Sequence, residues 1–168
     1  MPFVVTFTFA LMEKKSLTPD QALQKIRQYC AYQERSHSEV KDKLYGYGLN
    51  RREVDEILST LIEENYLNEE RFAIQYAGGK FRMKQWGRVK IRYALRQKQV
   101  SEYCIKKALA SIPETDYQRT LQKLFEEKLR SLRSEKNMFT RKRKIQDHLL
   151  QKGYEAALVS SLTAQAGA

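Results

Sequence analysis

The sequence is poor in glycine, proline and cysteine. With 7 glycines and 3 prolines in 168 residues, it has few turn-forming residues, which favours helices over a β fold with many short strands. The two cysteines, Cys30 and Cys104, have no metal-ligand or CxxC spacing. We therefore expect reduced, buried thiols in a cytoplasmic protein. No apolar run approaches the roughly 20 residues that span a bilayer, so no membrane association is expected.

Motifs for catalysis or cofactor binding are also missing. The 2 histidines, His37 and His148, lie apart from any cluster of possible ligands, and a zinc site needs about four ligands. Gly78-Gly79-Lys80 lacks the rest of a phosphate-binding loop. No Ser/His/Asp or Cys/His arrangement is present. These absences predict a protein with no catalytic residue, no metal and no cofactor.

One short apolar run, FVVTFTFALM at residues 3–12, stands apart from the rest. It has neither the basic start nor the clear small-residue cleavage site of a signal peptide, so export is not expected. We interpret residues 1–17 as an N-terminal extension. A short strand and a disordered tail both remain open for this segment.

The main feature of the sequence is a repeated apolar pattern. A leucine ends one predicted helix, an apolar residue follows five positions later, and another apolar residue lies one helical turn before the leucine. The second copy follows the first after 51 residues, and the third follows after a further 54. A repeat of this period predicts stacked helical units that share a core. The predicted core residues are Val40, Leu44, Leu49, Ile91, Leu95, Val100, Ile145, Leu149 and Tyr154.

Helix-start signals divide the chain into three predicted three-helix units. Thr18, Ser36 and Asn50 are each followed three residues later by Gln or Glu, which is the pattern of a capping box. In the third unit, Asn137 marks a break and Thr140 is expected to start the second helix. The predicted units are residues 18–66, 67–113 and 114–168, the last ending in a frayed tail after Leu162. A unit of about 50 residues buries little surface alone, so neighbouring units must stack. We predict an all-α protein of three tandem helix-turn-helix-like repeats, elongated and curved, and a monomer.

Basic residues are concentrated in the second and third units. Residues 80–107 contain 10 basic residues and 1 acidic residue, and residues 116–152 contain 11 basic and 5 acidic residues. Residues 13–79, in contrast, contain 10 basic and 12 acidic residues. The excess of positive charge predicts an acidic or polyanionic partner.

The positive charge is expected mainly on the second helix of each unit. Arg88, Arg92 and Arg96 recur every four residues, so they share one side of a helix, away from Ile91 and Leu95. Such a row is either a binding surface or an ordinary solvated face, and its repetition in the third unit favours binding. The candidate partner- or DNA-binding residues are Lys80, Arg82, Lys84, Arg88, Arg92, Arg96, Lys98, Arg141 and Lys144.

The helical pattern and the positive charge suggest three functions, one of which is disfavoured. A helix-turn-helix that reads the major groove is disfavoured, because Glu53, Asp55 and Glu56 make the third helix of the first unit acidic. Direct, sequence-independent binding of nucleic acid through the basic face stays open. An adaptor protein whose basic face is only solvated also stays open.

The order and spacing of several short motifs resemble the RecX family of regulatory proteins. No single motif is specific, and the resemblance covers residues 19–162. Gln99 stands where a glycine is common in the family, and residues 3–12 have no counterpart. The matching residues are Arg35-Ser36, Glu39-Val40, Leu44, Leu61, Asn65-Tyr66-Leu67-Asn68, Arg71-Phe72-Ala73, Lys84, Gly87, Ile91, Leu95 and Gly153-Tyr154.

The resemblance implies a fold and a partner that the composition alone does not. The fold is three repeats of a three-helix unit. The implied partner is the RecA recombinase, bound in the groove of the RecA–DNA filament. Binding would suppress ATP hydrolysis, strand exchange and coprotease activity, so the protein would be a cytoplasmic modulator and not an enzyme.

Overall fold

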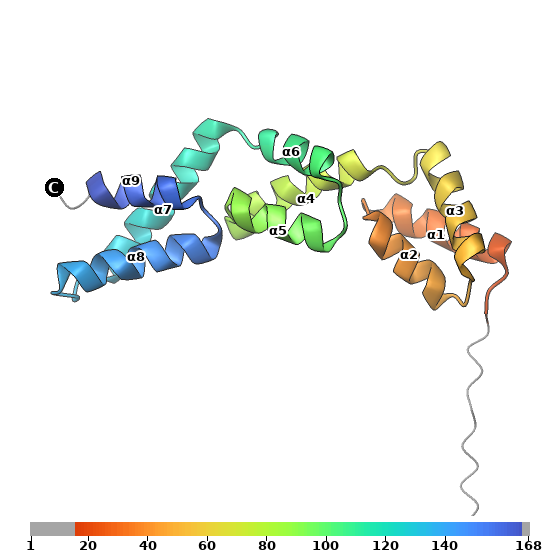
Figure 1. Cartoon of the computed structure of the whole chain (residues 1–168), viewed down its shortest axis with the longest axis horizontal. Coiled ribbons are helices and arrows are strands. Elements are labelled where there is room, and N and C mark those ends of the chain that lie inside the picture. The colour runs from red at the N-terminus through yellow and green to blue at the C-terminus, as the bar shows by residue number, and fades with distance from the viewer. Residues whose placement is uncertain (1–15, 166–168) are drawn as a thin grey trace, which may run out of the picture.

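The computed structural model describes residues 16–165, and over this range the chain forms nine helices and no strand. The helices form three groups of three that lie in an elongated row (Figure 1). The all-α fold of three-helix repeats is therefore confirmed. Of the predicted extension, residues 1–17, the first fifteen lie outside the described range. No helix in that range is long and apolar enough to cross a membrane.

The first unit is built from helices whose starts are fixed by side-chain caps. It contains α1 (Pro19–Tyr32), α2 (His37–Gly46) and α3 (Arg51–Glu63). Thr18, Ser36 and Asn50 cap these helices, and each makes a reciprocal capping box with the residue three positions later. A capping box satisfies two backbone groups that a helix start leaves without partners. The helices enclose a core of their own, centred on residues such as Ile26, Leu44 and Leu61.

The second and third units share one continuous core. The second unit contains α4 (Glu69–Lys84), α5 (Arg88–Gln97) and α6 (Glu102–Ala110). The third contains α7 (Glu114–Ser131), α8 (Met138–Lys152) and α9 (Ala156–Gln165). The buried apolar residues of both units form a single cluster, which excludes those of the first unit. All nine predicted core residues are at most 7% exposed.

Two helix ends in the third unit differ from the sequence prediction. Thr140 was expected to start α8, but the helix starts at Met138, because the side chain of Asn137 is the cap and accepts the Thr140 N–H. The tail after Leu162 was expected to fray. Instead α9 continues to Gln165, and the Thr163 side chain is buried and donates to the Val159 carbonyl.

The same backbone position makes contact with the preceding segment in all three units. The carbonyls of Tyr47, Lys98 and Lys152, each just after or at the end of the second helix, occupy equivalent positions in the repeat. They accept hydrogen bonds from the Leu17 N–H at 2.9 Å, the Ser38 hydroxyl at 2.9 Å and the Gly87 N–H at 2.8 Å. Each unit is therefore joined to what precedes it through the end of its second helix.

Candidate interaction surface

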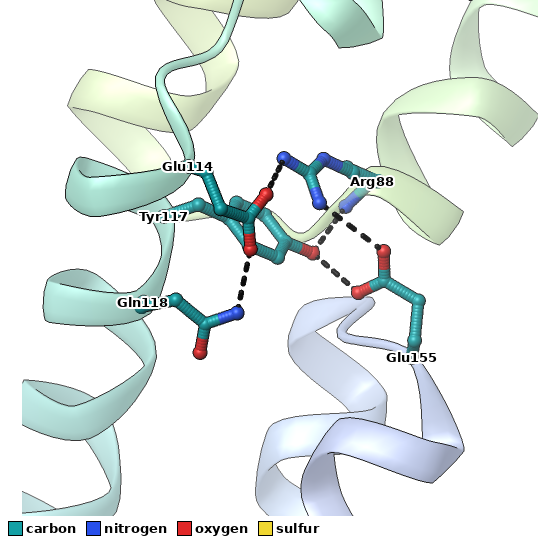
Figure 2. Close-up of polar contacts among 5 residues, drawn as sticks. All are labelled: Arg88, Glu114, Tyr117, Gln118 and Glu155. Atoms are coloured by element: carbon teal, nitrogen blue, oxygen red, sulfur yellow. Dashed lines mark hydrogen bonds and ion pairs between the residues drawn. The ribbon is translucent and has the colours of Figure 1, made fainter.

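The arginine row of α5 lies on the side of the helix that turns away from the core, but its first member is engaged inside the protein. The Arg88 guanidinium is 2.7 Å from Glu114 and 3.8 Å from Glu155, and it lies 4.0 Å above the ring of Tyr117. Its side chain is only 23% exposed. Figure 2 shows that these partners come from the third unit. Arg88 thus connects the second unit to the third.

Tyr117 and Glu155 complete the network around Arg88. The Tyr117 hydroxyl accepts the Arg88 backbone N–H at 2.9 Å and donates to Glu155 at 2.6 Å (Figure 2). Burial, and then the hydrogen bond to Glu155, raise the pKa of Tyr117. Hydrogen bonds from Gln118 and Arg88 lower the pKa of Glu114. At neutral pH the network therefore contains a neutral tyrosine and an ionised Glu114, which suits a fixed positive charge.

The other two arginines of the row share one carboxylate. Arg92 and Arg96 are 2.7 Å and 3.1 Å from Glu102, which lies in the first turn of α6. Hydrogen bonding from Arg96 is the main cause that lowers the pKa of Glu102. Two positive charges face one negative charge here, so this part of the row keeps an excess of positive charge. Its side chains are also more exposed than that of Arg88.

A second group of cations lies where the end of α4 and the start of α5 meet the end of α8, and we call Lys80, Lys84, Lys90 and Lys152 the lysine cluster. The ammonium groups of Lys80 and Lys90 lie 5.1 Å and 4.8 Å from the Trp86 ring centroid. Lys90 donates to the Gln151 carbonyl at 3.2 Å, and Lys152 donates to the Lys84 carbonyl at 3.3 Å. Within residues 16–165, none of the four forms an ion pair with a carboxylate. Their charges are therefore available to an anionic partner.

Some of the remaining candidate residues form contacts within the protein, and others are exposed to solvent. Lys98 is 2.7 Å from Glu39 and connects the second unit to the first. Lys144 is 2.8 Å from Glu135. Arg141 is half-buried, and its Nη2 group donates to the Leu129 carbonyl at 3.5 Å. Arg82 is exposed on α4. Of the candidates, Lys80 lies beside Trp86 together with Lys90, and the Lys84 backbone carbonyl accepts from Lys152.

The sequence prediction missed the acidic partners of the arginine row and the role of Trp86. Glu114 starts α7 and Glu155 directly precedes α9, so neither shares a helix with Arg88. Nothing in the spacing of the residues shows that they meet. Glu102 carried a signal, because it is the one acidic residue in the segment from 80 to 107. No group of three or more potential metal ligands is found in the described part of the chain.

The fold and its surfaces define a tandem three-helix-repeat protein with positively charged surfaces. Two family models match it: the second three-helix domain of RecX over residues 68–109 and the third three-helix domain of RecX over residues 114–162. The chain belongs to the RecX family.

Curated relatives carry the name "Regulatory protein RecX". The relative from Clostridium perfringens strain 13 is 33% identical over 129 residues, which cover 76% of this chain and 60% of the relative. The relative from Bacillus cytotoxicus is 29% identical over 132 residues, which cover 78% of this chain and 48% of the relative. The chain thus spans about half to 60% of the length of these relatives.

Two solved structures share the fold. A crystal structure of regulatory protein RecX matches with a TM-score of 0.78 and 24% identity, covering 88% of this chain and 71% of that one. The crystal structure of RecX from Lactobacillus salivarius matches with a TM-score of 0.78 and 22% identity, covering 88% of this chain and 95% of that one. At this level of identity, the similarity establishes the fold.

Proposed function

We propose that this chain regulates the RecA recombinase by binding RecA and the groove of the RecA–DNA filament. In this proposal, binding lowers ATP hydrolysis, strand exchange and coprotease activity. Membership of the RecX family, whose relatives are named as regulatory proteins, is the observation that carries the proposal. The row of three units offers a long surface, which suits a partner that is itself a filament.

The contacts to the filament are assigned to cations that the fold does not neutralise. The lysine cluster and Arg82 meet this condition best, whereas Arg88 is used to join the second and third units. Arg92 and Arg96 contribute the charge that Glu102 leaves uncompensated. Lysine and arginine side chains of this kind bind acidic side chains or phosphates and release counterions.

The test measures RecA activity directly. The protein is added to RecA, ATP and single-stranded DNA, and ATP turnover is followed over a range of protein concentrations. We expect turnover to fall as the protein approaches the concentration of RecA. Unchanged turnover at a large excess of protein contradicts the proposal.

Direct binding of nucleic acid is a second candidate function, and the lysine cluster specifically favours it. Cations around a partly exposed aromatic ring suit a single strand, whose phosphates need positive charge and whose bases stack on aromatic side chains. Trp86 is half-buried, so part of its ring remains accessible. This function predicts binding of a labelled oligonucleotide without RecA, with an affinity that falls steeply as salt is raised.

A pair of double variants separates a local site from net charge. Lys84→Glu with Lys90→Glu reverses two charges in the lysine cluster, and Lys25→Glu with Lys106→Glu reverses two charges elsewhere. We expect the first pair to weaken oligonucleotide binding by about tenfold or more, because each lost phosphate contact also removes its counterion release. The second pair should change it little. Equal losses in both would show that only the total charge matters.

A further inference from the structure

An apolar groove lies on the third unit, beside the start of α8. Its volume is about 360 Å³. Phe125 and Ile145 are buried and form the floor of the groove, and Leu129 in its wall is half-buried. Met138 and Phe139, in the first turn of α8, also line it and are 62% and 76% exposed. The space is large enough for one or two bulky side chains.

The segment that lines the groove is equivalent to the segment of the second unit that contacts the third unit. Ile91 and Ile145 are equivalent core residues, so residues 85–89 of the second unit correspond to residues 139–143 of the third. In the second unit this segment contacts the turn that follows α8 of the third unit. Gly87 donates to the Lys152 carbonyl at 2.8 Å, and Val89 donates to the Gly153 carbonyl at 3.0 Å.

The third unit cannot make this junction in the same way. α5 starts at Arg88, whereas α8 starts at Met138, which corresponds to Lys84. This additional helical turn replaces the non-helical segment that precedes α5 in the second unit. The N–H of Arg141, which is equivalent to the N–H of Gly87, therefore donates to the Asn137 carbonyl within its own helix start. The groove is therefore not a vacant copy of the repeat junction.

The charges beside the groove favour an acidic occupant. Arg141 and Lys142 line it, and no carboxylate in the described range forms an ion pair with either. The buried Nε of Arg141 has no hydrogen-bond partner, and the one hydrogen bond from its guanidinium is the 3.5 Å contact to the Leu129 carbonyl. A guanidinium with so few acceptors around it is suited to bind a carboxylate.

We propose that this groove binds a short acidic segment of a partner protein, which inserts one large apolar side chain. The apolar side chain packs between Phe139, Met138 and the buried part of the groove. Carboxylates of the same segment pair with Arg141 and Lys142. This binding site is separate from the lysine cluster, and the proposal does not depend on regulation of RecA.

The test uses the full chain and a synthetic peptide as the probe. A fluorescein-labelled peptide with aspartates and glutamates on both sides of a single Phe-Leu pair is titrated with the protein, and anisotropy is measured. We expect saturable binding. Replacing the peptide's Phe and Leu by Ala should weaken it about tenfold or more, because a large apolar side chain is then no longer buried.

Variants of the protein locate the site. Phe139→Ala should weaken binding about tenfold, and Lys142→Ala should weaken it severalfold with a reduced dependence on salt. Met83→Ala is the matched control, because Met83 is 80% exposed on another unit. All three positions are exposed, and circular dichroism checks that each variant keeps its helices.

Several outcomes would overturn the proposal. If binding does not saturate at millimolar peptide, the groove is not a binding site for such a segment. If the peptide without its Phe-Leu pair binds equally well, the binding comes from charge alone. An equal loss in Met83→Ala places binding elsewhere. Sedimentation that shows a dimer, abolished by Phe139→Ala, would make a second copy of the chain the occupant instead.

Discussion

A single hydroxyl group holds together the network between the second and third units. The Tyr117 side chain is fully buried, and its hydroxyl accepts the Arg88 N–H and donates to Glu155. The ring also contacts Phe81 and Tyr154, with centroids 5.8 Å and 5.0 Å away. Packing and polar contacts therefore meet in one side chain, and substitution can separate their contributions.

Removing only the hydroxyl tests the polar contribution. In Tyr117→Phe the ring still packs, but the Arg88 N–H and the Glu155 carboxylate lose their shared partner. Leaving such groups unsatisfied costs about 1–3 kcal/mol, so the free energy of unfolding, measured with urea, should fall by about that amount. Tyr93→Phe, at a side chain 65% exposed, should change it by less than about 0.5 kcal/mol. Equal stability of both variants would show that the network contributes nothing.

For individual residues, the sequence predicted which side chains are buried better than which side chains form ion pairs and hydrogen bonds. Ile91 and Leu95 follow from helical periodicity alone, because burial depends on which side of a helix faces the core. The partners of Arg88 depend on how two units meet, which periodicity does not contain. Gln99 adopts a φ of +58°, the left-handed region that glycine enters most easily. A glycine at this position would adopt the same conformation without the strain of a side chain.

At the scale of elements, the short segment between α4 and α5 forms the junction with the third unit. Gly87 caps α5 without a side chain and lies against the turn that follows α8. A Cβ atom on Gly87 would lie 2.2 Å from the Gly153 carbonyl oxygen. Contacts between real Cβ atoms and backbone are never so short, so only glycine lets the two units approach.

Two glycine variants should have opposite effects on stability. Gly87→Ala must push the second and third units apart, and we expect a loss of about 2 kcal/mol or more in the free energy of unfolding. Gly79→Ala lies inside α4 with nothing within 4 Å of its Cβ, so it should gain up to about 1 kcal/mol from helix propensity. Thermal unfolding of both variants measures the difference. A stable Gly87→Ala protein would mean that the junction yields easily.

Helix boundaries were predictable where a cap was recognised and wrong where it was not. Thr18, Ser36 and Asn50 were identified as caps, and each accepts the backbone N–H three residues on. Asn137 has the same role in α8, but no Glu or Gln follows three residues later to complete the pattern. The predicted start of α8 was therefore two residues too late, and Met138 and Phe139 were not recognised as helical residues that share an exposed surface. The groove on the third unit was therefore not foreseen.

At the scale of the whole molecule, residues 16–165 form two apolar cores and not three. The second and third units share one apolar cluster, and the first unit has its own. Between the first and second units the contacts are largely polar, including Lys98 with Glu39 and Arg71 with Glu34. The sequence repeat predicts three equivalent units, but the chemistry of the junctions makes them unequal. Partly exposed ion pairs stabilise a junction by only about 1 kcal/mol or less.

The division into two cores predicts that the first unit can unfold while the others remain folded. Leu61 is fully buried in the first core, and Leu61→Ala should cost about 2–5 kcal/mol there. Hydrogen exchange measured by mass spectrometry should then show lower protection in α1–α3 and little change in α5–α9. Leu149→Ala, at an equally buried position of the shared core, should instead lower protection in both the second and the third unit. Uniform loss of protection across all nine helices in Leu61→Ala would show that the polar junction couples the two cores into one cooperative structure.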